Sequence, residues 1–336
     1  MSAPIRHGGG VADAAARYGG CETAWLDLST GINPCPPVLP EIEERTWHRL
    51  PDRSLDVAAC EAARVFYHSG TILPLAVPGT QSVIQVLPRL ADPTRHIAIF
   101  SPTYGEYARA FALAGFEVDG VASMDDIGPQ HQLVVLVNPN NPDGRVFSSV
   151  EVEALAQRLA AQGSYLVVDE AFCDCSPEVS VAARVERSPN LIVFRSFGKF
   201  FGMAGMRLGF VIAEASLREQ FSTWLGPWAV SGPALSVASS LMQGEADVIR
   251  KSLLERRAAL DAVLNAAGLR VRGGTALFSL VELDDAAGLH DHLCQCHILT
   301  RVFDYAPKWM RLGLAPDADG DHRLASALAD WKAMRL

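Results

Sequence analysis

Lys199 stands among aromatic and glycine residues, in the run from Arg195 to Gly202, and its amine points more directly to chemistry than any other group in the sequence. An amine held in poor solvent has a lowered pKa and becomes nucleophilic at neutral pH. A single lysine at the end of a strand is far more often a solvated surface residue. The chemical interpretation therefore depends on partner groups elsewhere in the chain.

Two such partners follow short apolar runs, at the points where buried strands should end. Asn141 and Asp169 each come after one of these runs, and a third run leads into Lys199 itself. Short apolar runs bounded by turn signals are typical of parallel strands buried on both faces, and ligands bind at the carboxyl ends of such strands. We therefore expect the three side chains to converge on one crevice. The runs are residues 133–137, 165–168 and 191–194.

These groups are what pyridoxal 5'-phosphate requires from a protein. An amine can bind the cofactor's aldehyde, a carboxylate can hold its ring nitrogen protonated, and an amide can reach its ring hydroxyl. Its phosphate needs an anion site, and free backbone N–H groups at a predicted helix start in Pro78–Ser82 supply one. Ser196 and Arg207 can add a hydroxyl and a guanidinium to that site. Tyr104, after the apolar run 96–100, can stack on the ring.

The order of these segments resembles that of the fold type I pyridoxal-phosphate enzymes, in the branch that contains histidinol-phosphate aminotransferase and threonine-phosphate decarboxylase. The resemblance covers nearly the whole chain and implies an α/β fold, with a mostly parallel sheet between helices in a large domain and a smaller α+β domain. Six motifs in order carry it: Gly79-Thr80, Tyr104, residues 140–144, Asp169 to Phe172, Ser196 to Lys199, and Gly205 to Phe210.

The resemblance also implies a role for each matching residue. Lys199 would bind the cofactor covalently, Asp169 would pair with the pyridine nitrogen, and Asn141 would meet the ring hydroxyl. A tyrosine often stands in the place of Phe172, so one hydrogen bond to the ring oxygen is expected to be absent. Leu50 stands where the family commonly has a tyrosine that reaches the cofactor phosphate of the neighbouring subunit. The other implied cofactor contacts are Gly79, Thr80, Gln81, Tyr104, Phe172, Ser196 and Arg207.

The two ends of the chain resemble the decarboxylases rather than the aminotransferases. The run His7-Gly8-Gly9 matches the decarboxylase opening, which implies that His7 and Gly8 lie at the substrate phosphate, and Asn33 matches a segment on the substrate side of the cofactor. Arg301 and Arg311 match two C-terminal arginines of the family, whose planar forks bind anionic groups. Pro227-Trp228 also looks like the decarboxylase, although such a pair is more often core.

The sequence thus predicts a pyridoxal-phosphate-dependent carbon–carbon lyase. It would decarboxylate L-threonine O-3-phosphate to (R)-1-amino-2-propanol phosphate, which in the resembled family becomes the aminopropanol linker of cobalamin. The nearest alternative is a histidinol-phosphate-type aminotransferase, because both share the cofactor machinery. A remote alternative is a serine acyl enzyme, since Ser196-x-x-Lys199 is also a nucleophile motif, but the companion Ser-Asp-Asn and Lys-Thr-Gly segments do not occur.

The whole chain fits a cytoplasmic enzyme with a small phosphorylated amino-acid substrate. Its 336 residues suit an arm over 1–40 that packs with the small domain, a cofactor-binding domain over 41–230 and a small domain over 231–336. The net charge of −9 argues against nucleic acid and anionic membranes as partners. We expect neither a membrane span nor a signal peptide. The family resemblance implies a homodimer.

The cysteines and histidines do not predict a metal site. Seven cysteines without a framework spacing indicate reduced thiols. In the segment from His290 to His297, a helix would place His290 with Cys294 and His292 with Cys296, but on different faces. Four convergent zinc ligands are therefore not expected.

Overall fold

The computed structural model describes residue 5 and residues 7–335, so residues 1–4, 6 and 336 lie outside the described residues. The described chain forms two compact units. The first comprises Pro37–Asn141 and Val146–Asp247, and the second comprises the described residues up to Pro36, the segment Pro142–Arg145 and the residues from Val248 onward. The sequence predicts that the cofactor-binding domain ends at residue 230. Helix α9 (Gly232–Leu241), which follows that position, belongs to the first unit.

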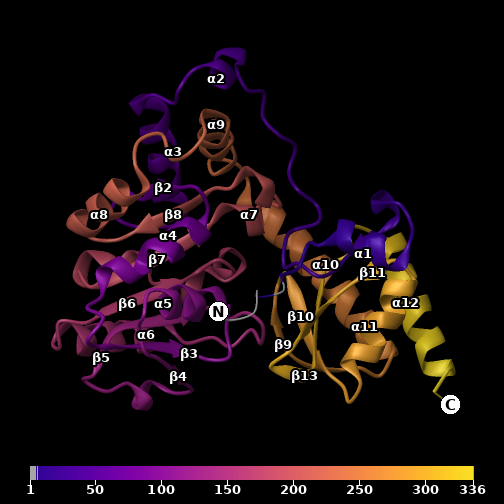
Figure 1. Cartoon of the computed structure of the whole chain (residues 1–336). Coiled ribbons are helices and arrows are strands. Elements are labelled where there is room, and N and C mark those ends of the chain that lie inside the picture. The colour runs from indigo at the N-terminus through magenta and orange to yellow at the C-terminus, as the bar shows by residue number, and fades with distance from the viewer. Residues whose placement is uncertain (1–4, 6, 336) are drawn as a thin grey trace. The chain divides into compact units, whose positions relative to one another are not determined.

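A seven-stranded sheet forms the centre of the first unit in the described chain (Figure 1). Its strands follow the order β2 (Leu75–Val77), β8 (Gly209–Ile212), β7 (Leu191–Ser196), β6 (Tyr165–Asp169), β5 (His131–Val137), β3 (His96–Phe100) and β4 (Val118–Val121). The strands from β7 to β4 are parallel, and β8 runs antiparallel to both of its neighbours. The sequence predicts this reversal, because the chain between β7 and β8 is too short for a crossover helix. The predicted mostly parallel sheet is confirmed.

Helices cover this sheet and begin where the sequence provides caps. Ser148 and Glu151 form a capping box at the start of α6, and the Asp52 carboxylate accepts hydrogen bonds from two backbone N–H groups at the start of α3. In the described part of the first unit, the helices that precede α9 are α2 (Glu44–His48), α3 (Arg53–Phe66), α4 (Thr80–Val86), α5 (Glu106–Leu113), α6 (Ser149–Ala160), α7 (Phe197–Phe200) and α8 (Ala215–Leu225).

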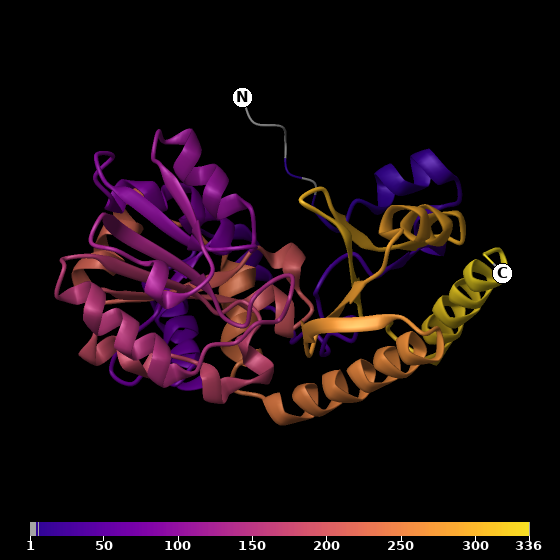
Figure 2. The same cartoon turned by 90° about the horizontal axis from the view of Figure 1, so that it is seen from below.

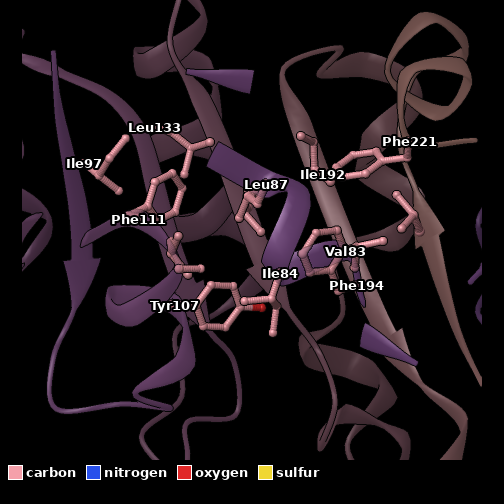
Figure 3. Close-up of a cluster of buried hydrophobic side chains, with 14 of the residues drawn as sticks. Val83, Ile84, Leu87, Ile97, Tyr107, Phe111, Leu133, Ile192, Phe194 and Phe221 are labelled. Carbon is pink, nitrogen blue, oxygen red and sulfur yellow. The ribbon is translucent and has the colours of Figure 1, made fainter. Parts of the chain in front are cut away.

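The core of this unit lies where α4 and α5 cover one face of the sheet (Figure 3). Val83 and Ile84 of α4 pack with Phe111 of α5 onto strand residues such as Leu133 and Ile192, all of them almost completely buried. Each large apolar side chain buried in this way stabilises the fold by roughly 1.5–3 kcal/mol. This packing fixes the start of α4 and the start of α5 at the carboxyl ends of the parallel strands.

The second unit is an α+β unit built on a four-stranded antiparallel sheet. Its strand order is β12 (Arg301–Phe303), β13 (Ala306–Gly313), β10 (Phe278–Glu282) and β9 (Arg270–Thr275). The long helix α10 (Ala246–Ala266) runs along this sheet (Figure 2), and Arg257 of α10 donates to the Phe278 carbonyl at 2.9 Å. The remaining helices are α1 (Val11–Tyr18), α11 (Ala286–Gln295) and α12 (Ala318–Ala333).

The N-terminal segment belongs to the second unit through a strand pair. Strand β1 (Leu26–Asp27) pairs in parallel with β11 (Ile298–Leu299). Among the described helices, none has the length and apolar character that crossing a membrane would require. The seven cysteines are free thiols.

Candidate active site

Asp169 ends β6 as a buried carboxylate whose two oxygens each accept a hydrogen bond. Its Oδ2 accepts from the Tyr107 hydroxyl at 2.8 Å, and its Oδ1 accepts from the backbone N–H of Ala171 at 3.0 Å. Burial raises the pKa of Asp169, whereas the two hydrogen bonds and the positive charge of Lys199 lower it. On balance the pKa of Asp169 is raised, because burial outweighs these contributions; the two donors fix the orientation of the carboxylate and act in favour of its ionised form.

Lys199 lies in α7, directly after β7, and is partly buried, whereas Phe197 and Phe200 of the same helix are buried. Its Nζ atom is 5.8 Å from the centroid of the Phe172 ring, so the residue that replaces the family's usual tyrosine faces the amine. Gly198 permits this arrangement, because an added Cβ would lie 2.6 Å from the Cα of Ala204. The charge of Lys199 acts on the pKa of Asp169, which places the predicted amine and carboxylate in one electrostatic environment.

Residues that are predicted to bind the cofactor phosphate lie at the junction of β2 and α4. Gly79 has a φ of +74°, and a Cβ added there would lie 2.8 Å from Nη2 of Arg207. The glycine thus leaves space for a guanidinium beside the first turn of α4. Arg207 is exposed and adopts a left-handed φ of 52°. Ser196 pairs with Gly209 in the sheet, and Gly209 in turn packs against the backbone nitrogen of Thr80.

Tyr104 and Gln81 form a polar chain next to this junction. The Tyr104 hydroxyl donates to Oε1 of Gln81 at 3.0 Å, and Nε2 of Gln81 donates to Glu106 at 3.1 Å. Burial, followed by the negative charges of Glu106 and Asp169, raises the pKa of Tyr104 to about 12. Tyr104 therefore keeps its proton at neutral pH.

Asn141 follows a tightly held loop after β5. The side chain of Asn138 exchanges two hydrogen bonds of 2.9 Å with the backbone of Phe147. The side chain of Asn140 donates to the Pro102 carbonyl at 2.9 Å. These bonds fix the backbone from which Asn141 extends, beside the carboxyl end of β5.

In the second unit, the two predicted anion-binding arginines lie directly opposite each other on β12 and β13. Arg311 is buried, its Nη2 donates to the Ser29 carbonyl at 2.6 Å, and its guanidinium lies 5.0 Å from the centroid of the Phe278 ring. Burial and then the charge of Arg301 lower the pKa of Arg311 to about 10. Like charges directly opposite one another destabilise a sheet, so this pair favours a bound anion.

The N-terminal glycine run lies against the same residue that Arg311 contacts. A Cβ on Gly8 would lie 2.4 Å from the Ser29 carbonyl oxygen, and the Gly9 N–H donates to the Ser29 hydroxyl at 2.7 Å. The exposed His7 therefore begins a segment that meets Arg311 at Ser29. Asn33 is buried and its Oδ1 accepts from the Cys35 N–H at 2.8 Å, which gives it a role in the turn.

The sequence analysis missed three residues that support the site. Tyr107 and Glu106 contact predicted site residues, and Arg195 forms buried ion pairs with Glu170, the neighbour of Asp169. A charged residue directly after the apolar run 191–194 is a signal that could have identified Arg195. For Tyr107 the sequence offers only its spacing from Tyr104, which a core tyrosine could share.

The histidine and cysteine segment of α11 forms local contacts. His290 lies 3.6 Å from the Cys294 sulfur and 2.8 Å from the Thr300 hydroxyl, whereas His292 bonds the Ala327 carbonyl at 2.8 Å. His290 and His292 thus bond different partners. Within the described residues, no group of three or more His, Cys, Asp or Glu side chains is placed to hold a metal ion.

Comparison with known proteins decides the family. Residues 23–328 match the family described as aminotransferase class I and II. The chain belongs to this family. It is 60% identical over 329 residues to a threonine-phosphate decarboxylase from Sinorhizobium sp, a match that covers 98% of this chain and 99% of the relative. A threonine-phosphate decarboxylase from Pseudomonas aeruginosa is 43% identical over 334 residues, with 98% of each chain covered.

A solved structure shows the same fold. The histidinol-phosphate aminotransferase from Sinorhizobium meliloti, in complex with pyridoxal-5'-phosphate, superposes with a TM-score of 0.83 at 20% identity. The match covers 100% of this chain and 96% of the other. The predicted family and the fold type I architecture are therefore confirmed, and the family match leaves the serine acyl-enzyme alternative without support.

Proposed function

We propose that the protein uses pyridoxal 5'-phosphate to decarboxylate L-threonine O-3-phosphate to (R)-1-amino-2-propanol phosphate. The observation that carries this proposal is the 60% identity to a threonine-phosphate decarboxylase over 98% of the chain. The arrangement of His7, Ser29 and Arg311 supports it, because this reaction needs a site for the substrate phosphate. In the cell, the proposed product would feed cobalamin biosynthesis, as the sequence resemblance implies.

The residues of the first unit fit the cofactor. The space that Gly79 leaves beside the Arg207 guanidinium and the start of α4 suits a phosphate, to which Ser196 adds a hydroxyl. The Asp169 carboxylate, oriented by its two donors, would hold a proton at the ring nitrogen, and Asn141 would hydrogen-bond the ring hydroxyl. Pyridoxal phosphate, when bound, supplies an aldehyde that links to amines and a ring that accepts electrons.

The residues of the second unit bind the substrate in this proposal. Arg301 and Arg311 neutralise its anionic groups, and the bound anion relieves the repulsion between the two guanidiniums. His7 adds a further contact to the phosphate. By holding the phosphate, these residues orient the substrate so that its carboxylate, rather than its hydrogen, leaves Cα.

Two side chains can return the proton to Cα after carbon dioxide leaves. The Lys199 amine is partly buried and faces Phe172, and a side-chain amine in this position can carry a proton to Cα. Tyr104, whose pKa of about 12 keeps the hydroxyl protonated, is the second donor. Neither role requires a second substrate, so the reaction needs no keto-acid acceptor.

The test is incubation of the purified, cofactor-loaded protein with L-threonine O-3-phosphate in the absence of any keto acid. We expect release of carbon dioxide and formation of aminopropanol phosphate, and loss of both in Lys199→Ala. A lysine-linked cofactor absorbs at roughly 410–430 nm, so wild type is yellow and Lys199→Ala lacks this band. Turnover that requires 2-oxoglutarate, or that occurs only with histidinol phosphate, would instead identify an aminotransferase.

We also propose a cytoplasmic homodimer. Apolar side chains of the first unit are exposed, among them Trp47 at 63% and Leu50 at 65%, and a partner subunit would cover them. Reduced thiols fit the cytoplasm. Analytical ultracentrifugation of the wild type and of Trp47→Glu tests the dimer, because a buried charge would dissociate it. Cell fractionation tests the location.

A further inference from the structure

Tyr107 makes a contact that its place in the core does not require. The side chain is fully buried, and Figure 3 shows its ring in the cluster with Ile84 and Phe111. Its hydroxyl nevertheless donates to Oδ2 of Asp169 at 2.8 Å. A phenylalanine would fill the same apolar space, so the hydroxyl is the part of this side chain that needs an explanation.

We propose that Tyr107 is a positioning residue that orients the Asp169 carboxylate for the ring nitrogen of pyridoxal phosphate and keeps it ready to accept a hydrogen bond. The proposal rests on the cofactor in the proposed function but not on the identity of the substrate. It adds to the site a residue on α5 that touches neither substrate nor cofactor and acts through Asp169.

The hydrogen-bond geometry supports this role. Tyr107 and the Ala171 N–H each occupy one oxygen of Asp169, so rotation of the carboxylate breaks at least one bond. Hydrogen bonds to a buried ionised group are about twice as strong as those between neutral groups, which makes this orientation strongly preferred. The carboxylate is therefore fixed before the cofactor arrives, and no reorganisation is needed at the moment of binding.

The charges around Asp169 make the hydroxyl necessary. Burial raises the pKa of Asp169 and the neighbouring Glu170 adds to this effect, whereas Tyr107, Ala171 and Lys199 oppose it. Burial and then the charge of Asp169 raise the pKa of Tyr107 well above its ordinary value of 10.0, so Tyr107 remains a donor. Removal of the hydroxyl would shift this balance towards a neutral Asp169, which pairs poorly with a protonated ring nitrogen.

The experiment compares Tyr107→Phe with Tyr165→Phe. Tyr165 packs against the same core cluster and begins the strand that Asp169 ends, so it controls for the loss of one hydroxyl. We expect Tyr107→Phe to bind pyridoxal phosphate roughly tenfold more weakly than wild type, as for a lost hydrogen bond to a charged group. We also expect the visible absorbance of its holoenzyme to titrate at a different pH. Tyr165→Phe should match wild type in both measurements.

A double-mutant cycle separates positioning from a purely structural effect. In an Asp169→Asn background, Tyr107→Phe should cause no further loss of cofactor affinity, because its target is already neutral. Equal losses in both backgrounds, or wild-type affinity and absorbance in Tyr107→Phe, would overturn the proposal.

A second experiment applies if Tyr107→Phe does not fold. Fluorotyrosine at position 107 keeps the ring and provides a stronger hydrogen-bond donor, so it should shift the absorbance titration in the opposite direction. An unchanged titration would likewise overturn the proposal. All readouts omit the substrate, so they remain valid if the proposed reaction is wrong.

Discussion

At the scale of single residues, the arginine pair of the second unit shows how binding can be favoured at the expense of stability. Arg301 and Arg311 are cross-strand partners in β12 and β13, and both carry positive charge. Folding must bring these two charges together, and burial followed by the charge of Arg301 lowers the pKa of Arg311. We therefore expect the unit to be more stable with a neutral residue at position 301, and a bound anion to offset the repulsion.

The first prediction follows for Arg301→Gln. Removal of one charge should raise the thermal midpoint of the apoprotein, by an amount that corresponds to roughly 0.5–1 kcal/mol, and should raise KM for a phosphorylated substrate. Inorganic phosphate should stabilise wild type more than the variant. Differential scanning fluorimetry with and without phosphate measures this.

A suitable control is Arg272→Gln, which removes an exposed arginine of the same sheet. Arg272 pairs with Glu282 at 2.9 Å, so its loss should lower the thermal midpoint slightly and leave the phosphate response unchanged. A lower midpoint in Arg301→Gln would contradict the view that the pair is repulsive.

At the scale of elements, the site depends on how each strand passes into the next helix. The junction of β2 and α4 requires glycine at position 79. Buried ion pairs connect the end of β7 with the segment that follows β6. Nη1 of Arg195 lies 2.6 Å from Glu170, its Nη2 pairs with Asp174, and its guanidinium lies 4.3 Å from the centroid of the Tyr67 ring. These contacts connect the strands that carry Asp169 and Lys199.

The second prediction concerns Gly79→Ala. A side chain there is strained by the positive φ and also meets the Arg207 guanidinium, so the variant should lose roughly 1–3 kcal/mol and bind pyridoxal phosphate more weakly. Gly163→Ala is the matched control. Gly163 has a φ of +66° with no atom within 4 Å of an added Cβ, so the change should cost stability alone. Equal cofactor affinity in the two variants would show that Gly79 does not shape the phosphate site.

The third prediction concerns Arg195→Met. It leaves Glu170 and Asp174 buried without their cation, which should cost about 3–5 kcal/mol in urea unfolding of the apoprotein. Arg187→Met breaks an exposed pair with Glu153 and should cost less than about 1 kcal/mol. If Arg195→Met costs less than about 1 kcal/mol, the prediction is wrong, because the structure around Glu170 and Asp174 must then rearrange to compensate for the lost cation.

At the scale of the whole molecule, the sequence predicts the architecture better than the supporting contacts. The apolar runs identify the strands β5, β6 and β7, and the short link after Lys199 identifies the reversal of β8, because these signals are local. The opposition of Arg301 and Arg311 depends on strand register, and the contact between Tyr107 and Asp169 depends on tertiary packing. Neither is encoded in a nearby motif. The placement of Pro142–Arg145 in the second unit is likewise a property of the folded chain.

The fourth prediction concerns stability against pH, far from the site. At the amino ends of the parallel strands, Asp119 bonds His96 at 2.8 Å and His131 at 3.0 Å. The His96 hydrogen bond lowers the pKa of Asp119 below 3.8, and the Asp119 hydrogen bond raises the pKa of His96 above 6.5. The Asp119 contribution is lost as pH falls through its lowered pKa, and the His96 contribution is lost as pH rises through its raised pKa.

Wild type should therefore exceed Asp119→Asn in thermal midpoint most clearly between the ordinary values of 3.8 and 6.5. The difference should shrink on both sides of this window. Asp125→Asn, a change at an exposed aspartate after the same strand, should give a difference from wild type that does not depend on pH. A difference for Asp119→Asn that is constant from acid to alkali would contradict the assignment.

The pairing of β1 with β11 has a consequence for synthesis of the chain. Leu26 leaves the ribosome early, but its partner Ile298 is among the later residues to be made. The first unit lies between them in sequence, so it can fold while the nascent N-terminal strand still lacks its partner. Translation must therefore pass residue 311 before Ser29 and Arg311 can meet, and a chain truncated before β11 would leave β1 without its strand partner.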